Sequence, residues 1–186
     1  MIGYAMCGSF CTLSRSLEVM RFLVATGLEV LPIMSPIVYS TDSRFTVADT
    51  FREQVRAVCG RDIVHTVDAA EPLGPRTPLD ALIISPCTGN TMAKIANGIT
   101  DTSVTMAAKA HLRCDRPLLI ALASNDAMSQ NLPNLARLLE RKGVYFVPMR
   151  QDDPVHKPHS LVADFSLVGE CLTAALAGEQ RRPLFL

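Results

Sequence analysis

The sequence L-I-I-S-P-C-T-G-N-T-M-A-K-I-A-N-G at residues 82–98 contains a strand, a turn and a helix in succession. Residues 82–84 form an apolar run of strand length, and we expect Ser85-Pro86 to end it because proline cannot donate to a ladder. A polar turn at 88–91 follows, and a helical pattern begins at Met92. This order predicts one unit of a parallel α/β sheet.

The polar turn at 88–91 also predicts a ligand site. A helix N-terminus offers free N–H groups and the positive end of its dipole, which suit an anion or a polar ligand. Gly89 lets a ligand approach the backbone closely, and Asn90 can both donate and accept, as a planar amide, a flavin edge or a carboxylate requires. The alternative is an ordinary helix cap after a buried strand.

The composition excludes several classes of protein. The 186 residues include 18 Lys and Arg and 18 Asp and Glu, so non-specific nucleic-acid binding is not expected. The length suits a single domain, residues 1–186. The sequence has no signal-peptide pattern and no membrane-length apolar segment, so we expect a cytoplasmic protein without a membrane partner. Six cysteines without Cys-x-x-Cys or zinc spacing predict reduced thiols and no metal.

Three further predicted strands each end in a polar turn. The strand and turn pairs are 2–6 with 7–12, 28–34 with Ser35, and 117–123 with 124–128. Because the carboxyl ends of parallel strands meet at one edge of a sheet, the four turns predict one pocket there. Gly8-Ser9 stands where phosphate often binds, although G-x-G-x-x-G is absent and N-capping is the alternative.

The rest of the chain alternates predicted helices and strands. Helices are expected at 13–26, 46–59, 104–111, 129–141 and 164–177. The alternation predicts a parallel sheet with helices on both faces. Residues 63–67 form a short strand carrying His65, which is either a packing residue or a functional one. The Pro-rich segment 69–78 and the polar segment 149–159 are expected to be loops.

The central motif resembles that of a known family. S-P-C-T-G-N-T-M-A-K-I-A-N-G-I-T-D at 85–101 is similar to P-A-S-A-N-T-x-x-K-x-A-x-G-x-x-D of the FMN-binding flavoproteins, which include cysteine decarboxylases and flavin prenyltransferases. A-S-N-D-A-M at 123–128 corresponds to their P-A-M-N-x-x-M, with Ser-Asn in place of Met-Asn. The resemblance spans 2–147 and implies a three-layer, flavodoxin- or Rossmann-like fold, bound FMN and a trimer-based homo-oligomer.

This resemblance implies a role for each corresponding residue. The implied phosphate-binding residues are Gly8, Ser9, Thr12 and Ser35. The other implied cofactor-binding residues are Pro86, Thr88, Gly89, Asn90, Thr91, Thr102, Ser103, Ser124 and Met128. The implied catalytic residues are Asn90 and Asn125 on the substrate side and His65, near the position of the decarboxylases' histidine.

Five segments resemble one subgroup of this family more closely, at 70–80, 85–94, 106–110, 124–127 and 151–158. That resemblance implies an oxidoreductase subunit of a sporulating bacterium, working with a second subunit that binds NAD(P). Its substrate would be a small dicarboxylate that becomes an aromatic pyridine, paired with Arg76, Lys94 or Lys109. The alternatives are a non-catalytic partner of that second subunit and a stand-alone FMN-dependent decarboxylase or prenyltransferase.

Overall fold

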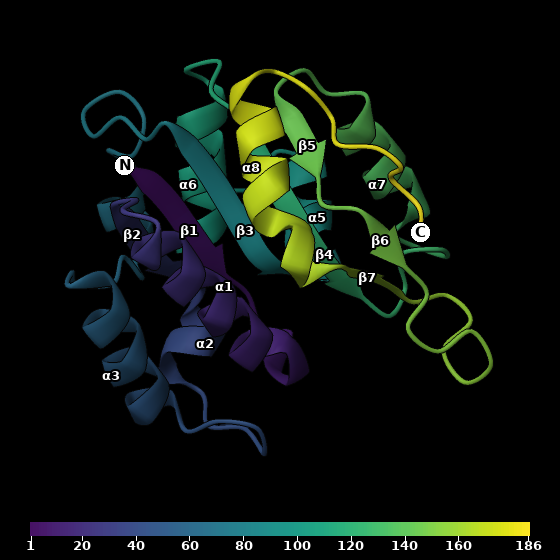
Figure 1. Ribbon diagram of the computed structural model, residues 1–186, viewed down its shortest axis with the longest axis horizontal. Helices are drawn as coiled ribbons and strands as arrows, with labels where there is room; N and C mark the ends of the chain where they lie inside the picture. The colour runs from purple at the N-terminus through teal and green to yellow at the C-terminus, as the bar shows by residue number, and fades with distance from the viewer.

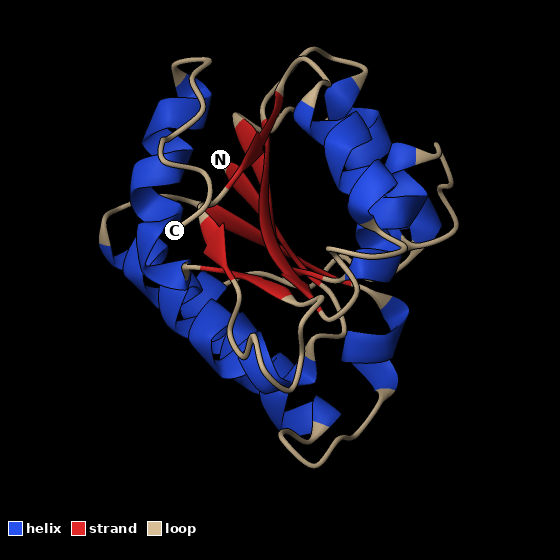
Figure 2. Ribbon diagram, turned by 90° about the vertical axis from the view of Figure 1, so that its right-hand side faces the viewer, coloured by secondary structure: helices blue, strands red, loops and turns tan.

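A mostly parallel sheet lies between two layers of helices in the computed structural model, which describes residues 1–186 (Figures 1 and 2). The parallel strands are β1 (Ile2–Met6), β2 (Val30–Met34), β3 (Ala81–Cys87), β4 (Leu118–Ser124) and β5 (Val144–Phe146). They lie in the order β2-β1-β3-β4-β5, the flavodoxin-like arrangement. The three-layer α/β fold predicted from the sequence is confirmed.

Two short antiparallel strands extend the sheet beyond β4. They are β7 (Leu161–Ala163) and β6 (Met149–Arg150). β5 pairs with the first half of β4, and β7 pairs with its end, where Ala123 is opposite Val162. The C-terminal residues cover the β6 edge, because Leu186 N donates to Met149 O and Met149 N donates to Leu184 O.

The helices divide between the two faces. One face is covered by α1 (Leu13–Ala25), α3 (Ala48–Cys59) and α8 (Val168–Leu176). The other is covered by α4 (Val67–Ala70), α5 (Gly89–Ala96), α6 (Ser103–Leu112) and α7 (Leu132–Leu139). Short helices α2 (Pro36–Ser40), η1 (Phe10–Thr12) and η2 (Phe165–Leu167) complete the structure.

The core is built from strands that are buried on both sides. In β3, Ile83 contributes to the cluster under α1 and α8, whereas Leu82 and Ile84 contribute to the cluster under α5 and α6. β4 is buried along its whole length in the same way. Such runs are apolar without alternation, as expected for central parallel strands. No helix is both long and apolar enough to cross a membrane.

The expectation that Ser85-Pro86 ends the central strand is wrong. β3 continues to Cys87 through a register shift against β4 between Ile84 and Cys87. The bulge accommodates the missing N–H of Pro86, whose peptide bond to Ser85 is cis. The carbonyl of Pro86 still accepts a hydrogen bond from Cys7 N at 3.1 Å, so the strand ends of β1 and β3 stay paired.

The two segments around His65 also differ from the prediction. Residues 63–67 form only a single bridge, Val64 to Ile33, because α4 begins at Val67. The 69–78 segment starts inside α4 and is the expected loop from residue 71 on, although it buries Leu73 and packs Gly74 against the backbone of Ala110. This segment precedes β3 and therefore lies at the amino edge of the sheet.

The remaining differences concern very short elements. The short helix α2 follows Ser35 directly and has no counterpart among the helices expected from the sequence. The expected loop at 149–159 contains β6, and the sequence pattern does not indicate β7. The closing helix begins at Val168, after η2, rather than at residue 164. Strands of two and three residues are too short to show a periodicity.

Candidate functional site

The four polar turns lie side by side at the carboxyl edge of the sheet. Ser35 N donates to Met6 O at 3.0 Å, and Cys7 N donates to Pro86 O, so the first three turns are adjacent. The fourth is adjacent too, because a Cβ on Gly89 would lie 2.6 Å from Asp126 Oδ1. The four turns therefore share one edge of the sheet, as the sequence predicts.

The β1 and β2 turns present hydroxyl groups with spare capacity. Ser35 is 7% exposed, and its Oγ is buried without a hydrogen-bond partner. Thr12 Oγ1 is 2.9 Å from Ser9 O and 3.0 Å from Ser9 Oγ, so the two hydroxyls form one small cluster at this turn. A Cβ on Gly8 would meet only a methyl of Ile37 within 3 Å. This half of the edge therefore offers hydroxyl groups that suit an anion.

The β3 turn begins α5 and caps it. Thr88 Oγ1 accepts from Thr91 N at 3.3 Å and donates to Thr91 Oγ1 at 3.2 Å, so both hydroxyls are engaged in the cap. Asn90 is exposed, and its amide makes no hydrogen bond within the chain. In the β4 turn, Asn125 is exposed in the same way, and Met128 is 41% exposed. These three side chains are available to a ligand or a second chain.

A chain of side-chain hydrogen bonds fixes the β4 turn, and it converges on the Asp126 carboxylate. Ser124 Oγ donates to Asp126 Oδ1 at 2.5 Å, and Asn131 Nδ2 donates to Asp126 Oδ2 at 2.8 Å. The chain continues from Asn131 through Asn134 and Asn97 to Arg137 at the surface. Sequence reasoning missed this network because its members are separated by up to 40 positions.

Gly89 lies directly against this network. Besides Asp126, a Cβ at Gly89 would lie 2.8 Å from Asn131 Nδ2 and still closer to Ser124 Oγ. The close approach that a glycine permits here is thus made by the protein's own β4 turn. The space that a Cβ would need at Gly89 is therefore filled by the protein itself, and the role of Gly89 toward a ligand stays a prediction.

The N-terminus of α6 is bound internally to the same edge. Ser103 is fully buried, and its Oγ donates to Met34 O at 2.5 Å. Thr102 and Thr105 form a reciprocal capping box. Ser103 therefore holds α6 against the end of β2, Thr102 caps the helix, and both hydroxyls are already paired.

His65 lies at the outer side of β2 rather than between the two asparagines. Its ring stacks on Tyr39 with centroids 3.7 Å apart, and its Nδ1 is 3.2 Å from Ile63 O. β1 and β2 separate it from β3 and therefore from Asn90. Within one chain no hydrogen bond joins His65 to Asn90 or Asn125.

None of the three predicted carboxylate-binding cations lies at the four turns. Arg76 belongs to the segment at the amino edge. Lys94 is paired with Asp101 at 2.7 Å and holds the pKa of that carboxyl below its ordinary value. Lys109 is exposed on the second half of α6, which runs away from the carboxyl edge.

The two buried thiols at this edge are not nucleophiles. Cys7 directly follows β1 and Cys87 ends β3, whereas Cys11 of the same first turn is exposed. Burial raises the pKa of Cys7 to about 11 and that of Cys87 well above its ordinary value. Both therefore remain protonated thiols at neutral pH.

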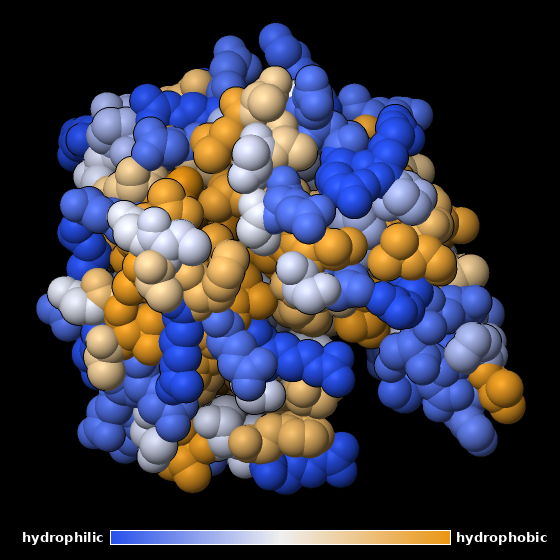
Figure 3. Space-filling view, in the orientation of Figure 1, coloured by the Kyte–Doolittle hydropathy of each residue, from blue (hydrophilic) through white to orange (hydrophobic).

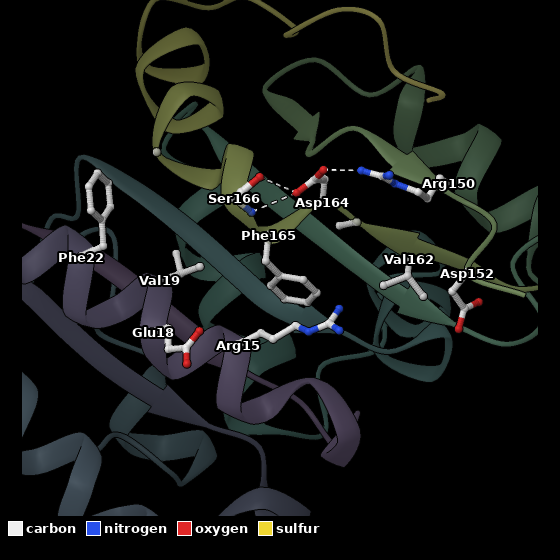
Figure 4. A pocket seen from close by; sticks show the side chains of 12 residues that line it. Arg15, Glu18, Val19, Phe22, Arg150, Asp152, Val162, Asp164, Phe165 and Ser166 are labelled. Atoms are coloured by element: carbon white, nitrogen blue, oxygen red, sulfur yellow. Dashed lines mark hydrogen bonds and ion pairs between the residues drawn. The ribbon is translucent and has the colours of Figure 1, made fainter.

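A cavity of about 710 Å³ lies outside the four turns, between α1, β7 and η2 (Figure 4). It opens beside the end of β4, because its lining residue Val162 pairs with Ala123. The loop at 151–160 stands away from the body next to this region and leaves a notch at the surface (Figure 3). Sequence reasoning missed the cavity because the sequence pattern does not indicate β7.

Comparisons with known proteins agree with the fold. The model of the flavoprotein family matches residues 2–168. The B subunit of dipicolinate synthase from Bacillus subtilis (strain 168) is 39% identical over 185 residues, which cover 100% of this chain and 92% of the relative. The crystal structure of the corresponding B subunit from Bacillus halodurans C gives a TM-score of 0.92 at 39% identity, covering 100% and 95% of the two chains. The FMN-dependent cysteine decarboxylase SpaF shares the fold, with a TM-score of 0.70 at 23% identity over 95% of each chain.

Proposed function

The chain belongs to the flavoprotein family as a homologue of the dipicolinate synthase B subunit, and we propose that it is the B subunit of a dipicolinate synthase. The reaction is the formation of pyridine-2,6-dicarboxylate from a dihydrodipicolinate-type precursor in the cytoplasm of a sporulating cell. A second, NAD(P)-binding A subunit takes part. The 39% identity over the full length of the chain carries this proposal.

The carboxyl edge fits an FMN phosphate at its β1 and β2 turns. Ser35 has a buried hydroxyl without a partner, and Gly8 follows β1 in the neighbouring turn. Ser9 and Thr12 add hydroxyls to the same turn. These four residues would hold the phosphate, whose negative charge suits the N-terminus of the helix that follows. When bound, FMN would supply a hydride acceptor suited to a dehydrogenation.

On the proposed substrate side, the chain contributes amides rather than titratable groups. Asn90 and Asn125 follow neighbouring strands, are exposed and have free donors and acceptors, so they can orient a polar ring substrate. Met128 provides apolar surface beside them. We also propose a trimer-based homo-oligomer, because an edge this open in one chain needs a second copy to exclude water.

A non-catalytic role beside the A subunit is the second candidate. The observation that favours it is the internal pairing of the Thr88, Thr102 and Ser103 hydroxyls, which leaves fewer groups for a flavin ring. In that case the carboxyl edge contributes to a site whose chemistry occurs on the partner.

The test is a titration of the purified chain with FMN, followed by assays with the A subunit. We expect saturable binding in the visible spectrum, weakened about tenfold in Asn90→Ala. Asn97→Ala is the matched control, because that amide faces the α7 network rather than the edge. We expect the mixture of subunits to exceed the A subunit alone. Equal rates with and without this chain would contradict a catalytic role.

A further inference from the structure

The cavity between α1 and β7 has the size and walls of a small-molecule site. Its volume of about 710 Å³ lies within the usual range of about 300–1,000 Å³. Val19 from α1, Val162 from β7 and Phe165 from η2 line it (Figure 4). The cavity is next to the end of β4 and α1 begins directly after the 7–12 turn, so it adjoins the proposed cofactor edge.

Most charges around this cavity are already neutralised. Asp164 accepts from Ser166 and Arg150, and these contacts hold its pKa below the ordinary value. Asp152 accepts from Ser160 at 2.7 Å and from Lys157 at 3.0 Å. Two pairs of groups on the β6–β7 side are thus satisfied within the protein.

Arg15 is the cation of this cavity without a partner. It makes no ion pair and no side-chain hydrogen bond, although it lies in the first turn of α1 among the cavity residues. Glu18 is on the same helix, yet no ion pair joins the two, and Figure 4 shows the Arg15 side chain extending toward Phe165 and away from the Glu18 carboxylate. An uncommitted guanidinium beside apolar walls favours an anionic ring ligand.

We propose that this cavity binds a planar ring carboxylate, with Arg15 pairing to the carboxylate and Val19, Val162 and Phe165 contacting the ring. The proposal rests on the proposed function, which supplies a pyridine dicarboxylate or its dihydro precursor as the ligand. Because the cavity lies outside the four turns, this site is separate from the Asn90 and Asn125 side of the edge, and it supplies a carboxylate-binding cation that Arg76, Lys94 and Lys109 do not supply there. Arg15 thereby becomes the specificity-determining residue of this second site.

The test is calorimetric titration of the purified chain with pyridine-2,6-dicarboxylate. We expect saturable binding, weakened about tenfold to a hundredfold in Arg15→Gln and less in Arg15→Lys, which keeps the charge but not the planar fork. Arg21→Gln is the matched control, because Arg21 is exposed on the same helix but lines a different cavity of about 380 Å³. The uncharged diamide of the same ring should bind wild-type chain as weakly as the diacid binds Arg15→Gln.

Two results would overturn the proposal: no saturable binding of the diacid at millimolar concentration, or equal affinity in Arg15→Gln and wild type. An FMN titration of the same proteins separates this proposal from the proposed function. Intact FMN binding without Arg15-dependent binding of the diacid would defeat only the inference about Arg15. Arg15-dependent binding without FMN binding would defeat only the cofactor proposal.

Discussion

The two halves of the carboxyl edge differ in how their polar groups are satisfied. At the β3 and β4 turns, Gly89 packs against Ser124 and Asp126, and hydrogen bonds continue to Arg137 at the surface. At the β1 and β2 turns, the buried Ser35 hydroxyl has no partner, and Gly8 has only a methyl group close by. We refer to these as the closed half and the open half.

The difference indicates that the two halves have different functions. A ligand that competed for the Ser124, Asp126 or Asn131 side chains would have to break hydrogen bonds that converge on one carboxylate, which is costly for buried groups, whereas the exposed Asn90 and Asn125 amides lie outside that network. A ligand in the open half gains a hydrogen bond with the Ser35 hydroxyl, which has no partner within the chain. The closed half therefore acts as a rigid support, and the open half is where we expect the phosphate of a cofactor.

The largest expected effect comes from adding one methyl group to the closed half. Gly89→Ala places a Cβ 2.6 Å from Asp126 Oδ1 and 2.8 Å from Asn131 Nδ2, so the network must move or lose partners. We expect a loss of about 3 kcal/mol in the free energy of unfolding, measured with urea. Gly8→Ala is the control, expected below about 1 kcal/mol because Ile37 is half exposed and can move. Similar losses in the two variants would remove the distinction between the halves.

A smaller effect is expected from neutralising the acceptor on which the network converges. Asp126→Asn exchanges one acceptor oxygen for a donor that faces Ser124 or Asn131. We expect a loss of about 1–2 kcal/mol in urea unfolding. Asp49→Asn, which removes an exposed ion pair with Arg52, should cost less than about 0.5 kcal/mol. An unchanged free energy of unfolding in Asp126→Asn would mean that this network does not stabilise the fold.

A still smaller effect is expected from His111, whose Nδ1 is, with Ser35 Oγ, the other buried side-chain atom without a hydrogen-bond partner. His111 Nε2 is 2.9 Å from Pro117 O at the amino edge, far from the proposed site. Burial lowers the pKa of His111, so the unfolded chain binds more protons between the folded pKa and the ordinary value. Stability that is present above about pH 6.5 is then lost as the pH falls through the folded pKa. We expect His111→Gln to flatten this pH dependence in thermal melts without changing FMN affinity; an unchanged profile would contradict it.

The sequence was sufficient for the parts of the fold that repeat a simple pattern. The apolar runs of β3 and β4, and the polar turn after each parallel strand, predicted the layers and the shared edge. The prediction that the strand ends at Pro86 was wrong because a bulge, which depends on the neighbouring strand, lets β3 continue past the proline.

The details of the site depend on contacts between distant residues. Gly89 could be identified as special, but its neighbours Asp126 and Asn131 are supplied by another strand and helix. The sequence also does not show whether a serine hydroxyl is hydrogen-bonded. Ser103 Oγ donates to Met34 O, whereas Ser35 Oγ has no partner. The Arg15 cavity depends on β7, and a strand of three residues is too short to be predicted from a sequence pattern.

The most direct measurement compares Ser35→Ala with Ser103→Ala, two buried serines at the end of β2, for both urea unfolding and FMN affinity. Ser35 has no partner to lose, so we expect its variant to keep its stability within about 0.5 kcal/mol while FMN binds about tenfold more weakly. Ser103→Ala leaves Met34 O without its donor and should lose about 1–2 kcal/mol with little change in FMN affinity of the folded protein. A stability loss in Ser35→Ala with unchanged FMN affinity would contradict the assignment of the open half to the ligand.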